Sequence, residues 1–433
     1  MQQIEIWALI PFVLMLLSIA IMPLIAEKWW DKNTNKLLVA VVLSIPASWY
    51  LITNGLSDKL EHQILFDYIP FIVLLGALFV VTEGIVIRGN IQARPRNNTI
   101  LLALGYFLAS FIGTTGAAML LIHVILDVNR VRTHKTHTIL FFIALVANCG
   151  GILSPLGDPP LFLLYLRGAE FTWFLNLLPE WAFVGATLLL IYFFLDRRLY
   201  YKEEKTEIIM ADFRESKLLT LKGKLNVVYL IGVILSVLYL NSSYIPQMGE
   251  HDAPIYIKYL REIVLIALSA LSLITTRKSI RTANHFSWAP ILEVAYIFIG
   301  IFITMTPALL FLSANAQKLG ITEPWQFYYS SGMLSAFLDN SPTAVAFHTV
   351  AQNLASEGGV LVAGVQEVLL KAIAMGAVFF GAMTYIGNGP NFMVKAIAEQ
   401  EGVKMPSFFG YIFKFSLKIL LPVYILAQII FLH

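Results

Sequence analysis

Long apolar stretches alternate with short polar loops along the whole chain, which is typical of a polytopic membrane protein. A helix needs about 20 apolar residues to cross the hydrocarbon core of a bilayer. The first stretch, Ile6 to Ala26, carries no charge, and its length together with the preceding Glu5 favours a span over a signal peptide. The pattern predicts ten spans, near residues 6–26, 37–53, 68–87, 138–156, 173–195, 225–242, 259–276, 291–313, 372–387 and 411–432.

Two further apolar stretches, near 97–126 and 325–356, are too long for one upright helix and too short for two. Cytoplasmic loops are rich in Lys and Arg. Basic residues flank the first stretch on both sides, whereas the second has none between Lys318 and Lys371. Each stretch is therefore predicted to enter and leave on one face, as a re-entrant hairpin, and the two hairpins enter from opposite faces. Irregular backbone is tolerated at that depth only inside the protein or along a cavity.

The same charge bias orients the chain. The segment 196–224 holds eight Lys and Arg and is expected in the cytoplasm, whereas 243–257 holds none and is expected outside. Both termini are then outside. Lys258 and Arg261 lie on the predicted outer side, against the rule.

The two hairpins repeat one pattern. Ser and His lie 13 residues apart in both, at Ser110 and His123 and again at Ser335 and His348. Because the hairpins enter from opposite faces, the halves are predicted to be inverted repeats, an architecture of many secondary transporters. The expected organisation is an N-terminal half (1–195, with hairpin 97–126 and broken helix 138–167), a cytoplasmic linker (196–224) and an inverted C-terminal half (225–433, with hairpin 325–356 and broken helix 372–398).

A helix must break at matching places in both halves. The first break, 148–160, contains three prolines, which lack an amide donor, and three glycines. The second, 384–391, contains Gly387-Asn388-Gly389-Pro390 where the first has Gly157-Asp158-Pro159-Pro160. A broken helix exposes carbonyls at one half-helix end, which suit a cation, and amides at the other, which suit an anion. The alternative is a proline kink without a ligand.

Asp158 and Asp339 are the two acids predicted deep in the membrane, one from each half. Such acids are costly in a bilayer and are functional candidates by default. We predict that the two carboxylates bind sodium or protons, with capping of the following half-helix as the alternative for Asp158. The other predicted ion or substrate ligands are Thr114, Thr115, Asn340, Ser341 and Thr343 at the hairpin tips, and Asn148, Ser154, Gly157, Thr384, Asn388 and Asn391 at the breaks.

The amino-acid composition excludes several classes of protein. Hydrophobic residues make up 58% of the chain and charged residues 13%. These values exclude a soluble enzyme, a disordered chain and a nucleic-acid-binding protein. The lone Cys149 cannot form an intrachain disulfide. The sequence has no Gly-rich phosphate loop or zinc motif, which argues against an ATP-driven pump and an enzyme.

The motifs resemble the ion transporter superfamily, which includes NhaD-type sodium/proton antiporters, arsenite permeases, citrate carriers and sodium-coupled dicarboxylate symporters. The resemblance rests on Gly157-Asp158-Pro159-Pro160, on Asp339-Asn340-Ser341-Pro342 and on Gly387-Asn388-Gly389-Pro390-Asn391. It implies a scaffold domain, a mobile transport domain, a homodimer and elevator-like movement. Dicarboxylate symporters carry Ser-Asn-Thr at both tips. Here the first tip is Thr114-Thr115-Gly116 and the second has an added acid, Asp339, which argues against dicarboxylate transport. Leu161 stands where many relatives have Asn after the double proline, so one expected polar ligand is missing.

We therefore predict an all-α secondary transporter, a sodium/proton antiporter in which both ions compete for the two acids. No cofactor is expected, and sodium is the predicted coupling or transported ion. The alternative is a cation-coupled symporter of citrate or another carboxylate, whose ligand would meet the amides at Pro390-Asn391. A channel and a non-transporting scaffold protein are the remaining classes. The expected surroundings are a bacterial inner membrane, with no nucleic acid partner. The sequence leaves open whether His123 and His348 transfer protons.

Overall fold

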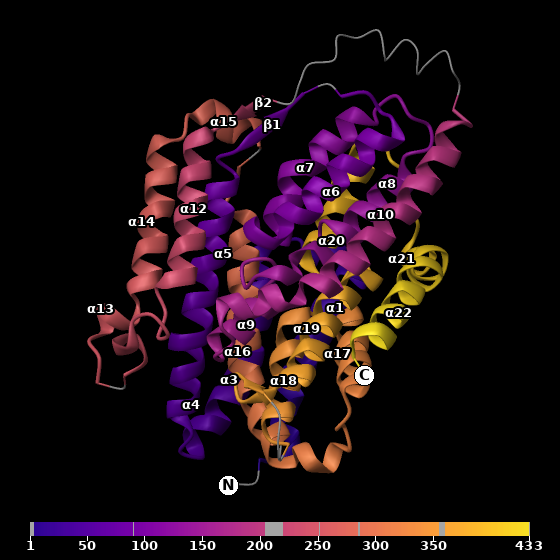
Figure 1. Cartoon of the computed structure of the whole chain (residues 1–433). Coiled ribbons are helices and arrows are strands. Elements are labelled where there is room, and N and C mark those ends of the chain that lie inside the picture. The colour runs from indigo at the N-terminus through magenta and orange to yellow at the C-terminus, as the bar shows by residue number, and fades with distance from the viewer. Residues whose placement is uncertain are drawn as a thin grey trace.

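A computed structural model of the chain describes residues 4–89, 91–203, 220–250, 252–284, 286–354 and 360–432. The described parts are helical apart from loops and two short pairs of strands, which confirms the all-α membrane fold (Figure 1). Seven of their helices are long and apolar enough to cross a membrane. Helices also form at the three remaining predicted spans, but α12, α14 and α19 have only 16, 16 and 14 residues.

The described part of the first half contains ten α-helices, one strand and four 3₁₀ or π turns of helix. In order they are η1 (Ile6–Leu9), α1 (Ile10–Ile25), α2 (Glu27–Trp30), α3 (Asn33–Thr53), α4 (Ser57–His62), η2 (Gln63–Tyr68), α5 (Ile69–Thr82), β1 (Val86–Arg88), α6 (Pro95–Ile112), α7 (Thr114–Val128), α8 (Thr136–Leu145), η3 (Cys149–Leu153), α9 (Pro159–Leu166), η4 (Phe171–Leu177) and α10 (Leu178–Tyr200). Of these, η2 is a π-helix and the other η elements are 3₁₀-helices.

The second half follows residues 204–219, the part of the predicted linker that lies outside the described residues. Its elements are β2 (Thr220–Lys222), α12 (Lys224–Tyr239), η5 (Pro246–Gly249), α13 (Ile255–Lys258), α14 (Leu260–Thr275), α15 (Lys278–Ala283), α16 (Ala289–Asn315), η6 (Ala316–Leu319), α17 (Pro324–Phe337), α18 (Asn340–Gln352), β3 (Leu361–Val362), β4 (Val365–Gln366), α19 (Glu367–Phe380), η7 (Gly381–Met383), α20 (Gly389–Gln400), α21 (Phe408–Tyr411), the π-helix η8 (Ile412–Leu420) and α22 (Leu421–Phe431).

Both predicted hairpins are present. Helices α6 and α7 are joined by Gly113 alone, whose φ of 80° lies in the left-handed region that favours glycine. Helices α17 and α18 are joined by Leu338 and Asp339. Figure 1 shows the first hairpin toward the end of the molecule with α15 and the second toward the opposite end, with both tips directed inward. The hairpins therefore enter from opposite ends.

The helix breaks share one set of hydrogen bonds. The Ser154 hydroxyl donates to the Ser110 carbonyl in α6 and accepts the Leu156 amide. In the second half, the Thr384 hydroxyl donates to the Ala336 carbonyl in α17 and accepts the Ile386 amide. Each break is thus fastened to the hairpin tip of its own half by a hydroxyl. The recurrence of these bonds supports the internal repeat.

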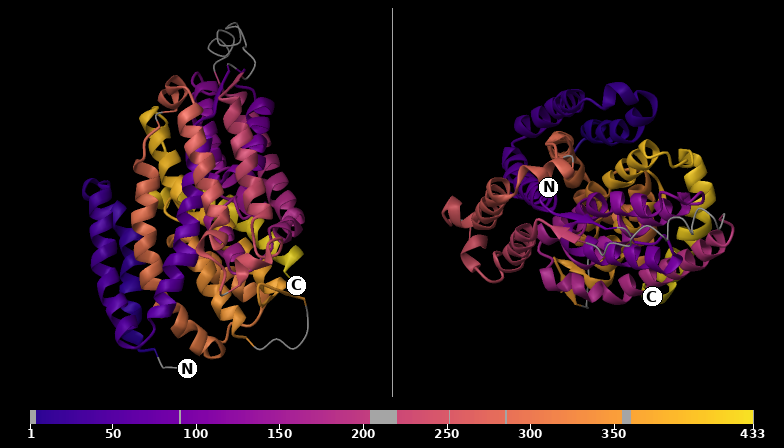
Figure 2. Two further views of the ribbon diagram at one scale, coloured as in Figure 1. Left: turned by 90° about the vertical axis from the view of Figure 1, so that its left-hand side faces the viewer. Right: turned by 90° about the horizontal axis from the view of Figure 1, so that it is seen from above.

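The two halves interlock around the breaks. The half-helix α9 packs against α18, the returning arm of the other half's hairpin, and α20 packs in the same way against α7. Helices α1, α3 and α16 pack together at one edge of the molecule, where α16 also contacts α18, and α5, α12 and α14 form another group (Figure 2). The hairpins and breaks therefore form a central unit with helices of both halves around it.

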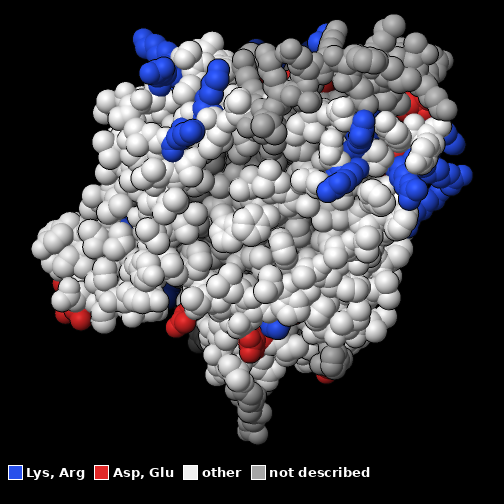
Figure 3. Space-filling view, turned by 45° about the horizontal axis from the view of Figure 1, so that its top comes forward, with Lys and Arg blue, Asp and Glu red and all other residues white. Residues whose placement is uncertain are grey.

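Basic residues mark one end of the molecule. Most visible Lys and Arg lie near the end with α15, and visible Asp and Glu lie mainly toward the other end (Figure 3). Strands β1 and β2 pair antiparallel at the basic end and connect α5 with α12. The charge rule predicts a cytoplasmic location for this end, as it does for the flanks of the first hairpin.

A buried ionic cluster fixes the end of α10 to the loop before α8. Arg132 Nη1 lies 2.6 Å and His137 Nε2 2.7 Å from Asp196 Oδ1. Glu203, just after α10, accepts the amides of Thr133 and His134 at 3.0 and 2.9 Å. Burial acts to raise the pKa of Glu203, but these two amides and the charge of Arg132 outweigh it and leave the pKa below its ordinary value.

Glu203→Gln is expected to lower stability at neutral pH by about 1–3 kcal/mol, because a buried, ionised hydrogen-bond acceptor is lost. Since the folded-state pKa of Glu203 is depressed, its contribution is present above the unfolded pKa, about 4.3, and disappears as the pH falls through the folded value. Thermal unfolding of both proteins across pH 7 to 3 measures this. A difference that grows as the pH falls would contradict the assignment.

Glycines allow the breaks to close on themselves. A Cβ on Gly157 would lie 1.8 Å from the Gly151 carbonyl oxygen, and a Cβ on Gly387 would lie 2.6 Å from the Gly381 oxygen. A Cβ on Gly389 would meet nothing within 4 Å. Equivalent glycines therefore meet in the two halves, Gly151 with Gly157 and Gly381 with Gly387.

Gly157→Ala is expected to destabilise the protein most, Gly387→Ala less and Gly389→Ala least. Overpacking against fixed backbone costs roughly 1–3 kcal/mol or more. The yield of monodisperse protein and its thermal unfolding in one detergent give the order. Equal stability of Gly157→Ala and Gly389→Ala would rule out the close approach.

Candidate functional site

Asp158 is the point at which both hairpin tips and the second break meet. Its side chain is buried, with 1% of the residue exposed. Its Oδ1 accepts the Thr114 hydroxyl at 2.8 Å and the Asn388 amide at 3.1 Å. Its Oδ2 accepts the Asn340 amide at 2.6 Å. Thr114 begins α7 and Asn340 begins α18, so one carboxylate connects both halves.

Three asparagines continue the polar cluster beside Asp158. Asn148 Nδ2 donates to Asn391 Oδ1 at 2.7 Å, and Asn388 Nδ2 lies 3.2 Å from Asn148 Oδ1. The Asn388 amide also lies 3.2 Å from the Ala147 carbonyl oxygen. Because an amide has two hydrogens, the three oxygens around Asn388 Nδ2 compete for it. The cluster therefore offers more oxygen acceptors than the amide can satisfy, which suits a proton or a small cation.

Of the two acids, Asp339 and not Asp158 caps a helix with its side chain. Asp158 precedes α9 but makes no side-chain capping hydrogen bond. Asp339 precedes α18, and its Oδ1 accepts the Ser341 amide at 2.9 Å. The capping alternative considered for Asp158 is therefore wrong for its side chain, and Asp339 is the capping residue. Asp339 is half-buried and shares no hydrogen bond with Asp158 among those of the described residues.

Other predicted ligands lie around this centre. Ser341 is 3.4 Å from Asn340 Oδ1, and Thr343 donates back to the Asp339 carbonyl. Thr115 is half-buried at the start of α7. Ser154 and Thr384 are used by the hairpin attachments described above, and the Gly157 carbonyl accepts the Thr114 amide at 2.8 Å. These last three residues position the site without donating to Asp158.

The histidines lie elsewhere. His348 Nε2 lies 3.1 Å from the Ala363 carbonyl oxygen, two turns along α18 from its tip. His123 is in the middle of α7. His348 is not among the three side chains that donate to Asp158, which are Thr114, Asn340 and Asn388.

The site has positive potential from backbone dipoles. Helices α7, α9, α18 and α20 all begin at the cluster, at Thr114, Pro159, Asn340 and Gly389. A helix N-terminus carries about half a positive charge. Across the described ranges, no Lys or Arg forms an ion pair with Asp158 or Asp339. Negative charge at the site is therefore stabilised by dipoles and neutral donors.

One predicted anion contact is already occupied. The Asn391 amide, expected to meet a carboxylate ligand, donates to the Asn388 carbonyl at 3.1 Å. Sequence reasoning also missed the carbonyls of Ala147 and Gly381, which bond Asn388 and Asn391. No side-chain pattern marks such carbonyls, since only the closing of the break brings them to the cluster.

Thr114→Val is expected to destabilise the protein by about 1–3 kcal/mol, because it removes a donor from a buried carboxylate. Thr114→Ser keeps the hydroxyl and serves as the control. In the Asp158→Asn background, the same Thr114→Val change is expected to have a smaller effect. Thermal unfolding of the four variants measures the coupling, and identical effects in both backgrounds would contradict the bond.

Comparison with known proteins identifies a family. A family model described as "Putative citrate transport" matches residues 1–432. No curated protein matches the chain significantly.

Proposed function

The chain belongs to the "Putative citrate transport" family, within the ion transporter group, and from this premise we propose that it carries a citrate-class carboxylate together with a cation bound at Asp158. It is an integral membrane protein of a transporter family.

The observation that supports this proposal best is the shared coordination of Asp158. Its three donors are Thr114 from the first hairpin, Asn340 from the second hairpin and Asn388 from the second break. In transporters built from inverted repeats, alternating access moves one part against the other around a site where the repeats meet. A carboxylate held by both halves lies where such a movement would change its surroundings.

Asp158 is the proposed cation site. A buried carboxylate that lacks a basic partner is costly, and a proton or sodium ion would remove that cost. Hard oxygen atoms from the Asn148 side chain and the Ala147 carbonyl lie in the same cluster, both bonded by the Asn388 amide that also donates to Asp158. The proposed ligand set for the cation is therefore one carboxylate with neutral oxygens.

The proposed coupling between substrate and cation follows from the charges of the substrate, Asp158 and the bound cation. A carboxylate substrate would be attracted by the N-termini of α7, α9, α18 and α20, as anions commonly are. An ionised Asp158 would repel it, and a bound cation would remove that repulsion. Each ligand would then strengthen the binding of the other, and this mutual dependence is what a symporter requires.

Sodium/proton antiport is the second candidate. It is favoured by the absence of a Lys or Arg partner of Asp158 within the described parts of the chain, since a trivalent substrate is usually met by cations. In this account sodium and protons compete for Asp158 and Asp339, and no organic substrate moves.

One experiment separates the two. Proteoliposomes containing the full chain and an internal pH-sensitive dye are given labelled citrate, a sodium gradient or a pH gradient. Symport predicts citrate uptake that an inward sodium or proton gradient stimulates, with no proton movement on a sodium jump alone. Antiport predicts the reverse. Flux of neither kind would contradict both.

Asp158→Asn keeps the shape of the side chain and removes the charge. We expect the cation dependence of citrate uptake to be lost, with coupled uptake reduced at least about tenfold, equivalent to 1.4 kcal/mol. Asp339→Asn can still accept the Ser341 amide and cap α18. Symport predicts that Asp339→Asn keeps most uptake, whereas two-acid antiport predicts that it is as inactive as Asp158→Asn.

A further inference from the structure

A cavity lined by polar and apolar residues lies toward the end of the molecule opposite α15 (Figure 1). It measures about 430 Å³ and is lined by residues of α4, η2, α16, α18 and the end of α9. Helix α9 starts beside Asp158 and ends at Leu166, and α18 starts at Asn340 and ends at Gln352. Two helices therefore run from the central cluster to this cavity.

The cavity contains charged groups of both signs. Arg167 follows α9, and its Nη2 lies 3.9 Å from Asp67 Oδ2. Lys59 and His62 of α4 also line the cavity. Not counting His62, two cations face one acid, so the cavity has an excess of positive charge. The long Arg167–Asp67 contact leaves the guanidinium able to take a second acceptor.

A buried amide in the same cavity has no hydrogen bond of normal geometry. Gln63 is 6% exposed, and the acceptor that its side chain approaches in this cavity is Asp67, one turn along η2. Gln63 and Asp67 lie on η2, a π-helix that interrupts the long helix from α4 to α5. Such interruptions occur frequently at functional sites. A buried donor without a well-formed hydrogen bond is costly, and an anionic ligand would give it a better acceptor.

We propose that this cavity is an outer binding site for a multivalent carboxylate, held by Arg167 and the Gln63 amide before it reaches the Asp158 cluster. The planar guanidinium can bind a carboxylate through two hydrogen bonds. On binding, the ligand replaces Asp67 as the partner of Arg167. The location follows the predicted orientation, in which this end faces outward, and the ligand class rests on the proposed function.

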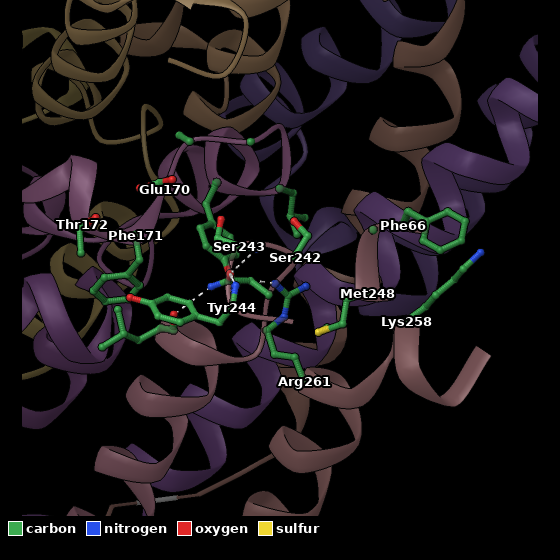
Figure 4. Close-up of a pocket in the computed structure, with 17 residues that line it drawn as sticks. Phe66, Glu170, Phe171, Thr172, Ser242, Ser243, Tyr244, Met248, Lys258 and Arg261 are labelled. Atoms are coloured by element: carbon green, nitrogen blue, oxygen red, sulfur yellow. Dashed lines mark hydrogen bonds between the residues drawn. The ribbon is translucent and has the colours of Figure 1, made fainter. Parts of the chain in front are cut away.

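A neighbouring cavity of about 280 Å³ provides a contrast (Figure 4). There Arg261 binds Glu262 Oε1 through Nε and Nη2, at 2.8 and 2.6 Å, and Tyr165 through Nη1. Its charge is therefore matched by the adjacent acid. Lys258 extends away from Ser242, Ser243 and Tyr244 in the same view. This makes Lys258→Gln a matched control, a basic residue removed from the same end but from another cavity.

The test uses the full chain in liposomes with Gln352→Cys, a change at the cavity wall. The natural Cys149 is buried and should react little. A membrane-impermeant maleimide is added from outside, and the labelling rate is measured with citrate, acetate or sulfate at equal ionic strength. Labelled citrate uptake is measured on the same preparation.

We expect citrate to slow labelling, with acetate and sulfate having little effect. Arg167→Gln should raise the citrate concentration needed for protection by roughly tenfold or more, as expected for the loss of a bidentate charged contact. Arg167→Lys should fall in between, and Lys258→Gln should match the parent. Asp67→Asn should lower the concentration needed, because the competing acid is gone. A purely structural ion pair predicts the opposite sign for Asp67→Asn.

Protection that does not depend on Arg167, or weaker protection in Asp67→Asn, would overturn the proposal. So would unprotected labelling in vesicles that take up citrate. If Arg167→Gln does not fold, the Asp67→Asn result decides. Arg167-dependent protection in vesicles without citrate uptake would support the cavity and contradict the proposed transport function.

Discussion

A carboxylate without a basic partner has to be stabilised in the middle of a membrane protein, and much of the central architecture meets that need. Asp158 is bonded by a hydroxyl and two amides, and each donor comes from a different helix start. Four helix N-termini add their dipoles. This arrangement requires both hairpins to end, and both long helices to break, at one depth. Because the two halves are repeats, each contributes one hairpin and one helix break.

The breaks are held by contacts that leave little freedom. Hydroxyls of Ser154 and Thr384 fasten each break to its own hairpin, and paired glycines let the backbone close on itself. The half-helices then pack on the opposite hairpins, α9 on α18 and α20 on α7. Displacing one half relative to the other would therefore change the donors around Asp158. Such a dependence on conformation is what alternating access requires of an ion site.

The sequence alone predicts the hairpins and helix breaks, but it does not predict which side chains form hydrogen bonds with one another at the site. Apolar length, proline and charge bias predicted the hairpins and breaks, because these depend on local composition. They could not show that Asn388, the counterpart of Asp158 in the repeat, donates to that carboxylate, since the contact joins residues 230 positions apart. Capping was considered as an alternative for Asp158 and not for Asp339 for a similar reason: backbone geometry at Asp339, not residue type, decides which acid caps a helix. The π-helix that carries Gln63 has no signature in apolar periodicity.

The central claim is that Asp158 takes up and releases the coupling cation during transport. Infrared difference spectroscopy of the reconstituted protein measures this directly. Adding citrate with sodium or acid should change a carboxyl band that is absent in Asp158→Asn and retained in Asp339→Asn. If citrate is transported while the Asp158 band stays unchanged, the coupling site lies elsewhere and the account is contradicted.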